Sequence, residues 1–425
     1  MTTAVEPSLT QNVLSPNDLL GGVADYVRSA FDANEAVLPV GGGTALDYGN
    51  LAIRPGRQLD LSGLAKIVDY TPRDMTILVE AGVRMADLAK TLAAENQQLP
   101  IDIPRAGEAT IGGVVATNWG GPRRYGHGTI RDYVIGIHAV DGRGVAFKGG
   151  GRVVKNVAGY DFCKLLTGSM GTLGVITQVA LKVKPQPECV GVVIAEIGNL
   201  NVAEDALGRL ALLEAPPVAI DLLVGTAWSE ASNSSPTAEQ LAANRISGSL
   251  CVRIEGTKIE VDWLSDRLIS EIGTAGGANA HRLEPAKSSE LWAQQVEFAD
   301  RGSDPSEDNS PLVAQIVIPP SSVVSMIGRL LGVDVGCSIQ AHAASGVIIA
   351  RFNKFTPSQL TAVLAGQLRP AAAQLGGSLV VVRSSLDGLT SHLRWGGRTD
   401  ATVLLERVKH KFDPKNILNP GRFVY

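Results

Sequence analysis

Cysteine is scarce in this sequence. Cys163, Cys189, Cys251 and Cys337 are spread through 425 residues and form no Cys-x-x-Cys pair. Zinc and iron–sulfur centres need closely spaced thiolate or imidazole ligands, and the sequence offers no such set. We therefore expect no metal centre, and we interpret the four cysteines as buried thiols of a protein in a reducing compartment.

Long apolar runs and blocks of positive charge are also missing. No apolar stretch approaches the ~18 residues that a membrane-spanning helix needs. The start of the chain contains Glu6, and its first basic residue is Arg28, which is unlike a signal peptide. We therefore expect a cytoplasmic protein without a membrane span, in which any membrane contact is made through a partner.

The charges of the chain are nearly balanced. It has 38 Lys and Arg against 42 Asp and Glu, a net charge of -4, without a concentrated basic block. Nucleic-acid binding depends on clustered positive charge, so we expect no nucleic-acid partner. A small acidic substrate could still meet local positive charge.

Glycine, by contrast, is concentrated. Of the 47 glycines, 17 lie between Pro104 and Lys184. Fixing glycine costs conformational entropy, so this density indicates a backbone that takes positive φ or closely approaches something else. Short β-rich segments at 133–140 and 173–183 separate the glycine groups, which distinguishes the stretch from a flexible linker. We interpret it as part of a folded nucleotide pocket.

Another glycine group follows a short strand expected at 36–40, in the run Gly41-Gly42-Gly43-Thr44. A strand that runs into glycines leaves backbone N–H groups available for phosphate oxygens. Taken alone, the run could equally be a plain turn. Leu46 stands where G-x-G-x-x-G needs its third glycine, and no Gly-Lys-Ser/Thr follows. A nicotinamide-binding Rossmann domain and a P-loop are therefore both disfavoured.

Hydrophobic periodicity predicts two α+β regions on either side of Pro185-Gln186-Pro187. In the first region, strands are predicted at 58–61, 66–70, 75–80, 134–147 and 173–183, and helices at 15–31, 84–96 and 161–166. In the second, strands are predicted at 190–197, 218–224, 249–254, 312–318, 347–352 and 378–382, and helices at 202–213, 261–272, 288–298, 321–331 and 357–375. A last helix is expected from Thr399 to His410.

Several motifs, in this order, resemble the FAD-linked oxidases of the vanillyl-alcohol oxidase and p-cresol methylhydroxylase (PCMH) type. They are the segments 39–44, 110–118, Tyr125-Gly126 with Asp132, 155–161, 168–174 and the Asp-Pro…Ile-Leu-Asn-Pro-Gly-Arg ending at 413–422. The resemblance covers roughly 36–184 and 412–423. Within the family, the set looks most like the FAD-binding accessory subunits of bacterial glycolate oxidase complexes.

The resemblance implies an α+β fold with three parts. A two-subdomain PCMH-type FAD-binding domain is expected at 1–187, and a ferredoxin-like α+β cap domain at 188–398. The segment 399–425 is expected to return and pack on the FAD-binding domain. Covalently flavinylated members carry a His just after the first glycine loop, where this chain has Thr44, so noncovalent FAD is implied.

The same resemblance implies which residues contact FAD. The loop from Gly41 to Leu46 should meet the pyrophosphate, and Gly171, Gly174 and Ile176 should lie at the adenosine end. The whole implied set is Pro39, Val40, Gly41, Gly42, Gly43, Thr44, Ala45, Leu46, Pro104, Glu108, Ala109, Thr110, Ile111, Gly112, Gly113, Thr117, Asn118, Tyr125, Gly126, Gly171, Gly174 and Ile176.

Two residues are candidates for catalysis. His342 begins a segment that matches a His-Ala-Gly-Asp-Gly-Asn-x-His motif of catalytic family members, but Ser345 and Ile349 replace an acid and the second His. A structural histidine is the alternative. Arg398, with Arg394 beside Trp395, could bind a carboxylate through a forked guanidinium, although a surface turn fits equally well. A counterpart of the family's Glu-His-Gly-Ile-Gly motif is missing from 384–397.

The resemblance thus implies an FAD-binding subunit of a 2-hydroxy-acid (glycolate) dehydrogenase complex. Hydride would pass from a small 2-hydroxy acid to the flavin, and electrons would leave to an iron–sulfur subunit beside a homologous FAD-binding catalytic subunit. The alternatives are a stand-alone FAD-dependent oxidase of another small alcohol or hydroxy acid, a non-catalytic electron-transfer or structural subunit, and a pyridine-nucleotide reductase of related fold.

Overall fold

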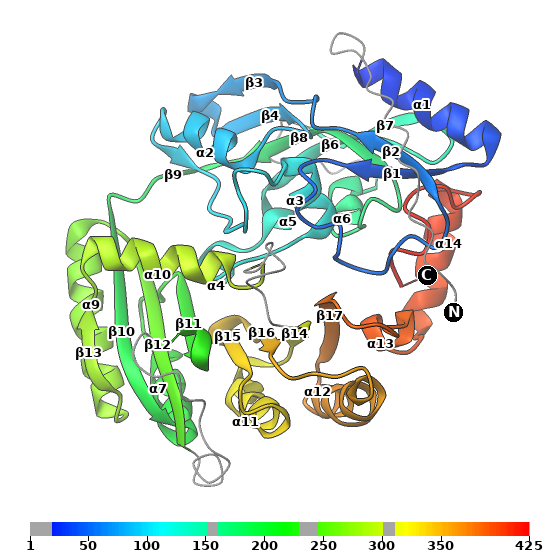
Figure 1. The fold of residues 1–425 in the computed structure, drawn as a ribbon. Helices are drawn as coiled ribbons and strands as arrows, with labels where there is room; N and C mark the ends of the chain where they lie inside the picture. Colours follow the sequence, from blue (N-terminus) through cyan, green and yellow to red (C-terminus); the bar gives the residue numbers. More distant parts are fainter. Residues whose placement is uncertain (1–18, 152–159, 229–244, 301–310, 425) are drawn as a thin grey trace. The chain divides into compact units, whose positions relative to one another are not determined.

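The computed structural model describes residues 19–151, 160–228, 245–300 and 311–424, which form two compact units (Figure 1). The first unit combines the chain up to Gly120, Thr129–Gln186 and the segment from Gly397. The second combines Gly121–Gly128 and Pro187–Gly396. The segment 121–128, which the sequence placed in the FAD-binding domain, thus belongs to the second unit.

A five-stranded antiparallel sheet, in the order β3-β4-β8-β6-β7, is the largest sheet of the first unit. Its strands are β3 (Ile67–Thr71), β4 (Thr76–Glu80), β6 (Val134–Val140), β7 (Ala146–Gly150) and β8 (Val175–Lys182). Two small sheets accompany it, a parallel pair of β1 (Ala36–Val40) with β2 (Gly56–Asp60) and a pair of β5 (Gln97–Gln98) with β9 (Lys184–Pro185).

Two apolar clusters hold the helices of this unit on its strands. Leu88 and Leu92 of α2 and Val115 of α3 pack with Val79 and Val179 of the five-stranded sheet. A second cluster joins α1 to β1, β2 and the C-terminal tail. The helices of the unit are α1 (Leu19–Ala33), α2 (Met85–Ala93), α3 (Ile111–Thr117), α5 (Ile130–Tyr133), α6 (Phe162–Leu166) and α14 (Asp400–Phe412).

The C-terminal tail returns to the first unit, as the sequence predicts. Leu418 forms a parallel bridge with Val37 of β1. Val37 N–H donates to the carbonyl of Ile417 (2.8 Å), and Asn419 N–H donates to the carbonyl of Val37 (3.0 Å). The tail therefore continues the small sheet that leads into the glycine run after β1.

The second unit contains an eight-stranded sheet in the order β13-β10-β12-β11-β15-β16-β14-β17. Each half has the chain order strand, helix, strand, strand, helix, strand, which is the ferredoxin-like arrangement. The halves join where β11 pairs with β15, with Asp221 opposite His342. The strands are β10 (Cys189–Asn199), β11 (Ala219–Val224), β12 (Arg245–Gly256), β13 (Ala278–Arg282), β14 (Leu312–Val317), β15 (Ser338–His342), β16 (Val347–Phe352) and β17 (Ser378–Ser384).

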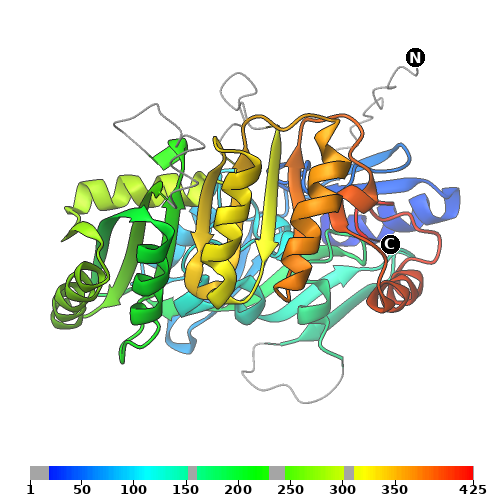
Figure 2. The ribbon, with the colours of Figure 1, turned by 90° about the horizontal axis from the view of Figure 1, so that it is seen from below.

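Most of the unit's helices cover one face of this sheet (Figure 2), whereas α10 (Pro285–Glu297) packs on the opposite face. Alternate strand residues such as Leu222, Val252 and Ile348 meet the apolar sides of these helices. Polar residues of the strands, including Asp221 and His342, lie on the opposite face because side chains alternate along a strand. The helices of the unit are α4 (Arg124–His127), α7 (Leu200–Leu210), α9 (Lys258–Thr274), α10 (Pro285–Glu297), α11 (Val323–Val333), the π-helical η5 (Leu360–Leu368), α12 (Arg369–Gln374) and α13 (Ser391–Trp395).

The sequence predicted most of these elements and the α+β fold class, which the structure confirms. It did not predict β13, β15 or the short helix α3, and it did not predict that the ferredoxin-like unit occurs twice. The predicted cap of α6 is confirmed, since the Asp161 side chain accepts a hydrogen bond from Lys164 N–H. The predicted helix start at 15–18 and the motif residues 155–159 lie outside the described residues.

None of the described helices combines the length and the apolar character that crossing a membrane requires.

The docking of the tail leads to a stability prediction. Leu418 is fully buried, whereas Leu404 on α14 is 63% exposed. Leu418→Ala should reduce the free energy of unfolding by about 2–5 kcal/mol, because it leaves a cavity in the core. The matched variant Leu404→Ala should change it by less than about 0.5 kcal/mol. Urea unfolding followed by circular dichroism measures both, and equal effects would argue against tail docking at this site.

Candidate functional site

A cavity opens within the first unit where the loop after β1 meets α3 and the loop before β8. It encloses about 1010 Å³ of space, including part that is open to solvent. Its lining is made mostly of glycine and apolar side chains. The residues are Pro39, Val40, Gly41, Gly42, Gly43, Thr44, Ala45, Leu46, Tyr48, Leu61, Ala81, Ile103, Pro104, Ala109, Thr110, Gly112, Gly113, Val114, Ala116, Thr117, Trp119, Met170, Gly171, Gly174, Val175, Ile176, Asn419 and Arg422.

The loop after β1 brings unused hydrogen-bond donors to this cavity. The backbone N–H groups from Gly42 to Ala45 donate to no other residue that the structure describes. Gly43 has a φ of +73°, a conformation that glycine adopts without strain. Consecutive unpaired N–H groups in such a loop form an anion-binding concavity. The loop therefore fits a diphosphate group.

Gly42 has a second, structural reason to be glycine. A Cβ atom on Gly42 would overlap the backbone carbonyl of Glu108, and one on Gly41 would overlap the hydroxyl of Thr110. The two segments therefore approach each other too closely for side chains. Substitution of Gly42 would disturb the packing of the loops as well as ligand binding, so it is an unsuitable probe of the cavity.

The first turn of α3 differs from the loop after β1 because its N–H groups are already used. Ile111 and Gly112 N–H donate to the carbonyls of Val83 (2.9 Å) and Ala81 (2.8 Å). Gly113 N–H faces the Thr110 hydroxyl, which caps the helix at 3.4 Å. This segment is a fixed wall of the cavity and not a source of free main-chain donors.

Some expected residues lie outside the cavity lining. Ile111 is fully buried in the core, and Glu108 points to Arg105, whose guanidinium lies 2.7 Å from its carboxylate. The hydrogen bond from Arg105 lowers the pKa of Glu108 despite the opposing effect of burial. Asn118 ends α3 in the left-handed conformation, with a φ of +52°. These three residues shape the neighbourhood of the cavity but are not part of its lining.

Tyr125 and Gly126 belong to the second unit, outside this cavity. Gly126 N–H donates to the carbonyl of Val218 (3.0 Å), just before β11. A Cβ on Gly126 would lie 2.7 Å from the Cα of Val218. The glycine is thus required where α4 packs against the strand region.

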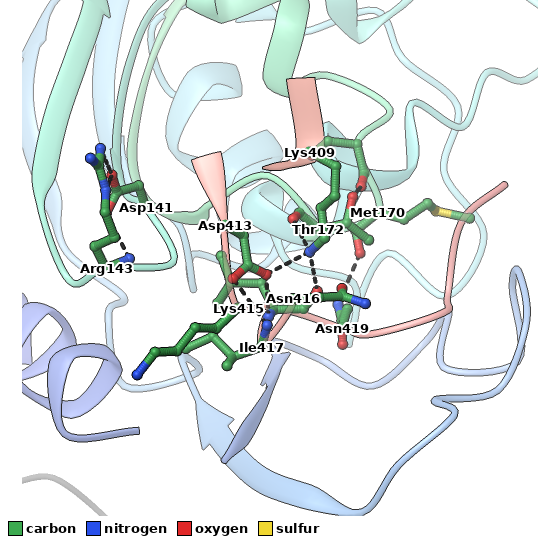
Figure 3. Close-up of polar contacts among 12 residues, drawn as sticks. Asp141, Arg143, Met170, Thr172, Lys409, Asp413, Lys415, Asn416, Ile417 and Asn419 are labelled. Atoms are coloured by element: carbon green, nitrogen blue, oxygen red, sulfur yellow. Dashed lines mark hydrogen bonds and ion pairs between the residues drawn. The ribbon is translucent and has the colours of Figure 1, made fainter. Parts of the chain in front are cut away.

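The C-terminal tail contributes a buried ion pair beside the loop at 170–172 (Figure 3). Lys409 Nζ donates to the carbonyl of Thr172 (2.8 Å), to Asp413 Oδ2 (2.6 Å) and to the carbonyl of Leu418 (2.9 Å). Asp413 also accepts from the N–H groups of Ile417 (3.0 Å) and Leu418 (2.7 Å). Burial lowers the pKa of Lys409, although the charge of Asp413 opposes this shift.

Two further tail residues reach the cavity itself. The Asn419 amide donates to the carbonyl of Met170 (2.9 Å). Arg422 Nη2 donates to the carbonyls of Ala45 (2.5 Å) and Leu46 (2.8 Å). Burial lowers the pKa of Arg422, and the charge of Asp47 acts in the opposite direction.

Arg422 is the one charged side chain among the described residues that line the cavity. A partly buried cation beside unused N–H groups is stabilised by a bound anion. The cavity therefore has the donor set and the charge that a dinucleotide diphosphate requires, together with apolar walls for ring systems. Sequence reasoning missed the role of Arg422, although this residue ends the C-terminal motif that it identified.

His342 is buried at the joint between the halves of the second sheet, on the face opposite the apolar helix-covered side. Its Nδ1 lies 3.0 Å from Asp221 Oδ1. The other oxygen of Asp221 accepts a hydrogen bond from the Gln340 amide (3.0 Å). Nδ1–H donating to Asp221 leaves Nε2 as the nitrogen with a lone pair. This arrangement suits a structural tie between strands and also a histidine that accepts a proton.

Arg398, the second catalytic candidate, lies just before α14 in the first unit. Its side chain is 67% exposed and pairs with Glu406 (2.6 Å). The structure therefore does not bring Arg398 into the lining of the cavity.

A group of charged residues in the second unit was not predicted. Glu255 of β12 lies 2.8 Å from Arg253, 2.9 Å from His127 and 3.3 Å from Arg123. The Arg253 guanidinium also lies over the ring of Trp292, 4.3 Å from its centroid. Burial alone would raise the pKa of Glu255, but the hydrogen bond to His127 and the charges of Arg123 and Arg253 lower it to about 2.

In the parts of the chain that the structure describes, His, Cys, Asp and Glu form no group of three or more that could hold a metal ion. Cys163, Cys251 and Cys337 are buried and Cys189 is partly buried, all of them as free thiols.

Comparison with known proteins shows which protein family the region around the cavity is similar to. A family model described as an FAD binding domain matches residues 20–150. Glycolate oxidase subunit GlcE of Escherichia coli is 41% identical over 133 residues, which are 31% of this chain and 38% of that subunit. The chain thus matches well under two thirds of that subunit's length.

Other relatives align over most of the chain at lower identity. Glycolate oxidase subunit GlcD of Bacillus subtilis is 24% identical over 91% of this chain and 83% of its own length. Mitochondrial D-lactate dehydrogenase [cytochrome] of Arabidopsis thaliana is 26% identical over 95% of this chain and 71% of its own length. A solved structure of alkyldihydroxyacetonephosphate synthase matches with a TM-score of 0.65, 19% identity, and coverage of 94% of this chain and 74% of that one, which shows a shared fold.

The buried ion pair of the tail leads to a second prediction. Lys409→Ala should reduce the free energy of unfolding by about 3–5 kcal/mol, because it leaves the buried Asp413 carboxylate unpaired. Lys411→Ala, on the exposed side of the same helix, should have almost no effect. Guanidinium-induced unfolding compares the variants, and a Lys409 variant as stable as wild type would show that the pair does not hold the tail.

The lowered pKa of Glu255 leads to a pH prediction. The ionised carboxylate contributes stability that is present above its ordinary pKa of about 4.5 and is lost as the pH falls from there toward about 2. Glu255→Gln should therefore lower stability at pH 7 and flatten the loss of stability between pH ~5 and ~3. Urea unfolding at several pH values measures this, with exposed Glu204→Gln as the control. An unchanged pH profile in Glu255→Gln would contradict the assignment.

Proposed function

Because the chain belongs to the FAD-linked oxidases of the PCMH type and uses FAD as its cofactor, we propose that it is the FAD-binding subunit of a 2-hydroxy-acid dehydrogenase of the glycolate-oxidising kind. The observation that carries the proposal is the loop from Gly42 to Ala45, whose unused N–H groups line a cavity together with Arg422. The names of the GlcE, GlcD and D-lactate dehydrogenase relatives support the substrate class.

In the proposed holoprotein, FAD is held noncovalently in this cavity. The N–H groups of the loop after β1 and the Arg422 guanidinium would face the diphosphate. Most of the residues that the sequence predicted for FAD line the cavity, and Tyr48, Trp119, Asn419 and Arg422 are added to them. Thr44, at the position of the covalently attached His in other family members, supports noncovalent binding.

Bound FAD supplies an acceptor for the hydride that leaves the α-carbon of a 2-hydroxy acid. The chain would have to remove the hydroxyl proton and hold the carboxylate. We propose His342 Nε2 as the proton acceptor, since Asp221 fixes the opposite nitrogen as a donor at 3.0 Å. Arg398 is proposed to bind the carboxylate, a role in which the acid would replace Glu406 as its partner.

The electrons need a route out of the chain. Its described residues contain no cluster of metal ligands, and its four cysteines are separated free thiols. We therefore propose two partners, an iron–sulfur subunit that takes the electrons and a homologous FAD-binding catalytic subunit. The complex would work in the cytoplasm, with any membrane contact made by its partners.

A stand-alone 2-hydroxy-acid dehydrogenase is the second candidate. The alignments with D-lactate dehydrogenases over 95% of this chain favour it. It differs from the first proposal in one measurable property, because the isolated chain would then reduce its own flavin with substrate.

Anaerobic substrate titration separates the two candidates. The purified chain is mixed with glycolate, D-lactate or L-lactate, and the visible absorbance of its flavin is recorded before and after co-purified partners are added. The proposed subunit should keep oxidised flavin alone and become reduced in the complex. To assign that reduction to this chain, the partner's own catalytic residues are inactivated. Full reduction of the isolated chain by a 2-hydroxy acid would establish the stand-alone enzyme.

A fourth prediction tests the cavity. Gly113 lies on α3, and a Cβ there would meet only the Thr110 hydroxyl at 3.4 Å. Gly113→Ala should keep or slightly raise stability, by up to about 1 kcal/mol, because alanine favours helices. It should nevertheless weaken FAD binding at least about tenfold, a cost of ~1.4 kcal/mol from lost space in the cavity.

The control is Gly21→Ala on α1, an exposed glycine of a helix with no neighbour within 4 Å of the added Cβ. Both variants are titrated with FAD after removal of bound flavin. Equal FAD affinities of the two variants would argue that FAD does not lie against α3.

A further inference from the structure

Two aromatic rings from distant segments meet in the lining of the cavity. Tyr48 follows the loop after β1, and Trp119 follows α3. Their ring centroids are 5.5 Å apart, and the ring planes are inclined by 53°. Rings at this angle do not cover each other face to face, so the pair forms a tilted wall and not a closed stack.

The two rings differ in burial. Tyr48 is 5% exposed and fixed within the unit, whereas Trp119 retains partial exposure while it packs against the core. The tyrosine therefore packs beside the indole, and the indole keeps surface available in the cavity.

The position of Trp119 is set by the end of α3. Asn118 takes the left-handed conformation with a φ of +52°, and its N–H donates to the carbonyl of Val114 (2.9 Å). The helix thus ends at Thr117, and Asn118 caps it directly before Trp119. An aromatic ring fixed in this way loses little entropy when it binds a ligand.

The composition of the cavity lining favours a planar ligand for this aromatic pair. Apart from Arg422, the described lining carries no charged side chain, and its other large groups are aliphatic. Planar heteroaromatic rings are the ligands that bind best to an indole surface, through stacking.

We infer that Trp119, supported by Tyr48, is a stacking platform for one of the two planar ring systems of FAD. The inference rests on the proposed binding of FAD in this cavity. It adds a positioning residue that neither the glycine motifs nor the C-terminal motif contains. Stacking of this kind changes affinity by about 5- to 150-fold per ring.

The test compares three variants as purified full-length protein after removal of flavin. Trp119→Leu removes the aromatic face, Trp119→Phe keeps one, and Trp263→Leu alters a tryptophan that is 55% exposed on α9. FAD, FMN and ADP are titrated by calorimetry, and the emission of bound flavin is recorded. Circular dichroism checks that each variant folds.

Trp119→Leu should bind FAD about 5- to 150-fold more weakly, and Trp119→Phe should recover most of the loss. Trp263→Leu should match wild type. A loss shared by FMN, with brighter bound flavin, identifies the isoalloxazine as the stacked ring. A loss shared by ADP, with unchanged flavin emission, identifies the adenine.

Unchanged affinity of Trp119→Leu for all three ligands would overturn the inference and leave the proposed function intact. Wild-type protein that binds no FAD would overturn both. If Trp119→Leu does not fold, the comparison of Trp119→Phe with wild type decides. The phenylalanine keeps an aromatic face, so a variant that retains neither the FAD affinity nor the flavin emission of wild type would rule out stacking.

Discussion

The buried ammonium group of Lys409 holds the C-terminal segment together and links it to Thr172, which is 237 residues away in the sequence. Its three acceptors are the Thr172 carbonyl, the Asp413 carboxylate and the Leu418 carbonyl. Asp413 in turn fixes the turn that places Leu418 beside β1. A buried ammonium needs this complete set of acceptors, since each unmade bond would leave a desolvated charge. The tail is therefore part of the fold around the cavity and not an appendage to it.

The glycines of the cavity serve two different purposes. After β1, they leave a run of N–H groups without a partner among the described residues, which suits a diphosphate. In the first turn of α3, Gly112 lies where a Cβ would come within 2.8 Å of Ala81, and its N–H is already bonded. The close packing of Gly41 and Gly42 against Thr110 and Glu108 holds the loop after β1 in place. Arg422 then adds a positive charge from the tail, at a site that is otherwise glycine and apolar.

Local patterns in the sequence were sufficient for the elements and for the first loop. Alternating apolar residues predicted β10, β11 and β14, and a strand followed by glycines predicted the loop at 41–46. Contacts between distant residues could not be predicted in this way. Lys409 and Thr172 are 237 residues apart, and Arg422 and Ala45 are 377 apart. Asp221, the partner of His342, likewise lies on a strand 121 residues away. Hydrophobic periodicity does not report such pairs, although an arginine directly after Asn419-Pro420-Gly421 could have suggested a ligand role for Arg422.

The central claim is that the first unit holds FAD noncovalently through main-chain donors. Its most direct test is the flavin content of the purified chain, measured before and after denaturation and after incubation of flavin-free protein with FAD. The account predicts one FAD per chain, released completely by denaturation and restored by incubation. A colourless protein that FAD cannot reconstitute, or flavin that stays attached after denaturation, would contradict it.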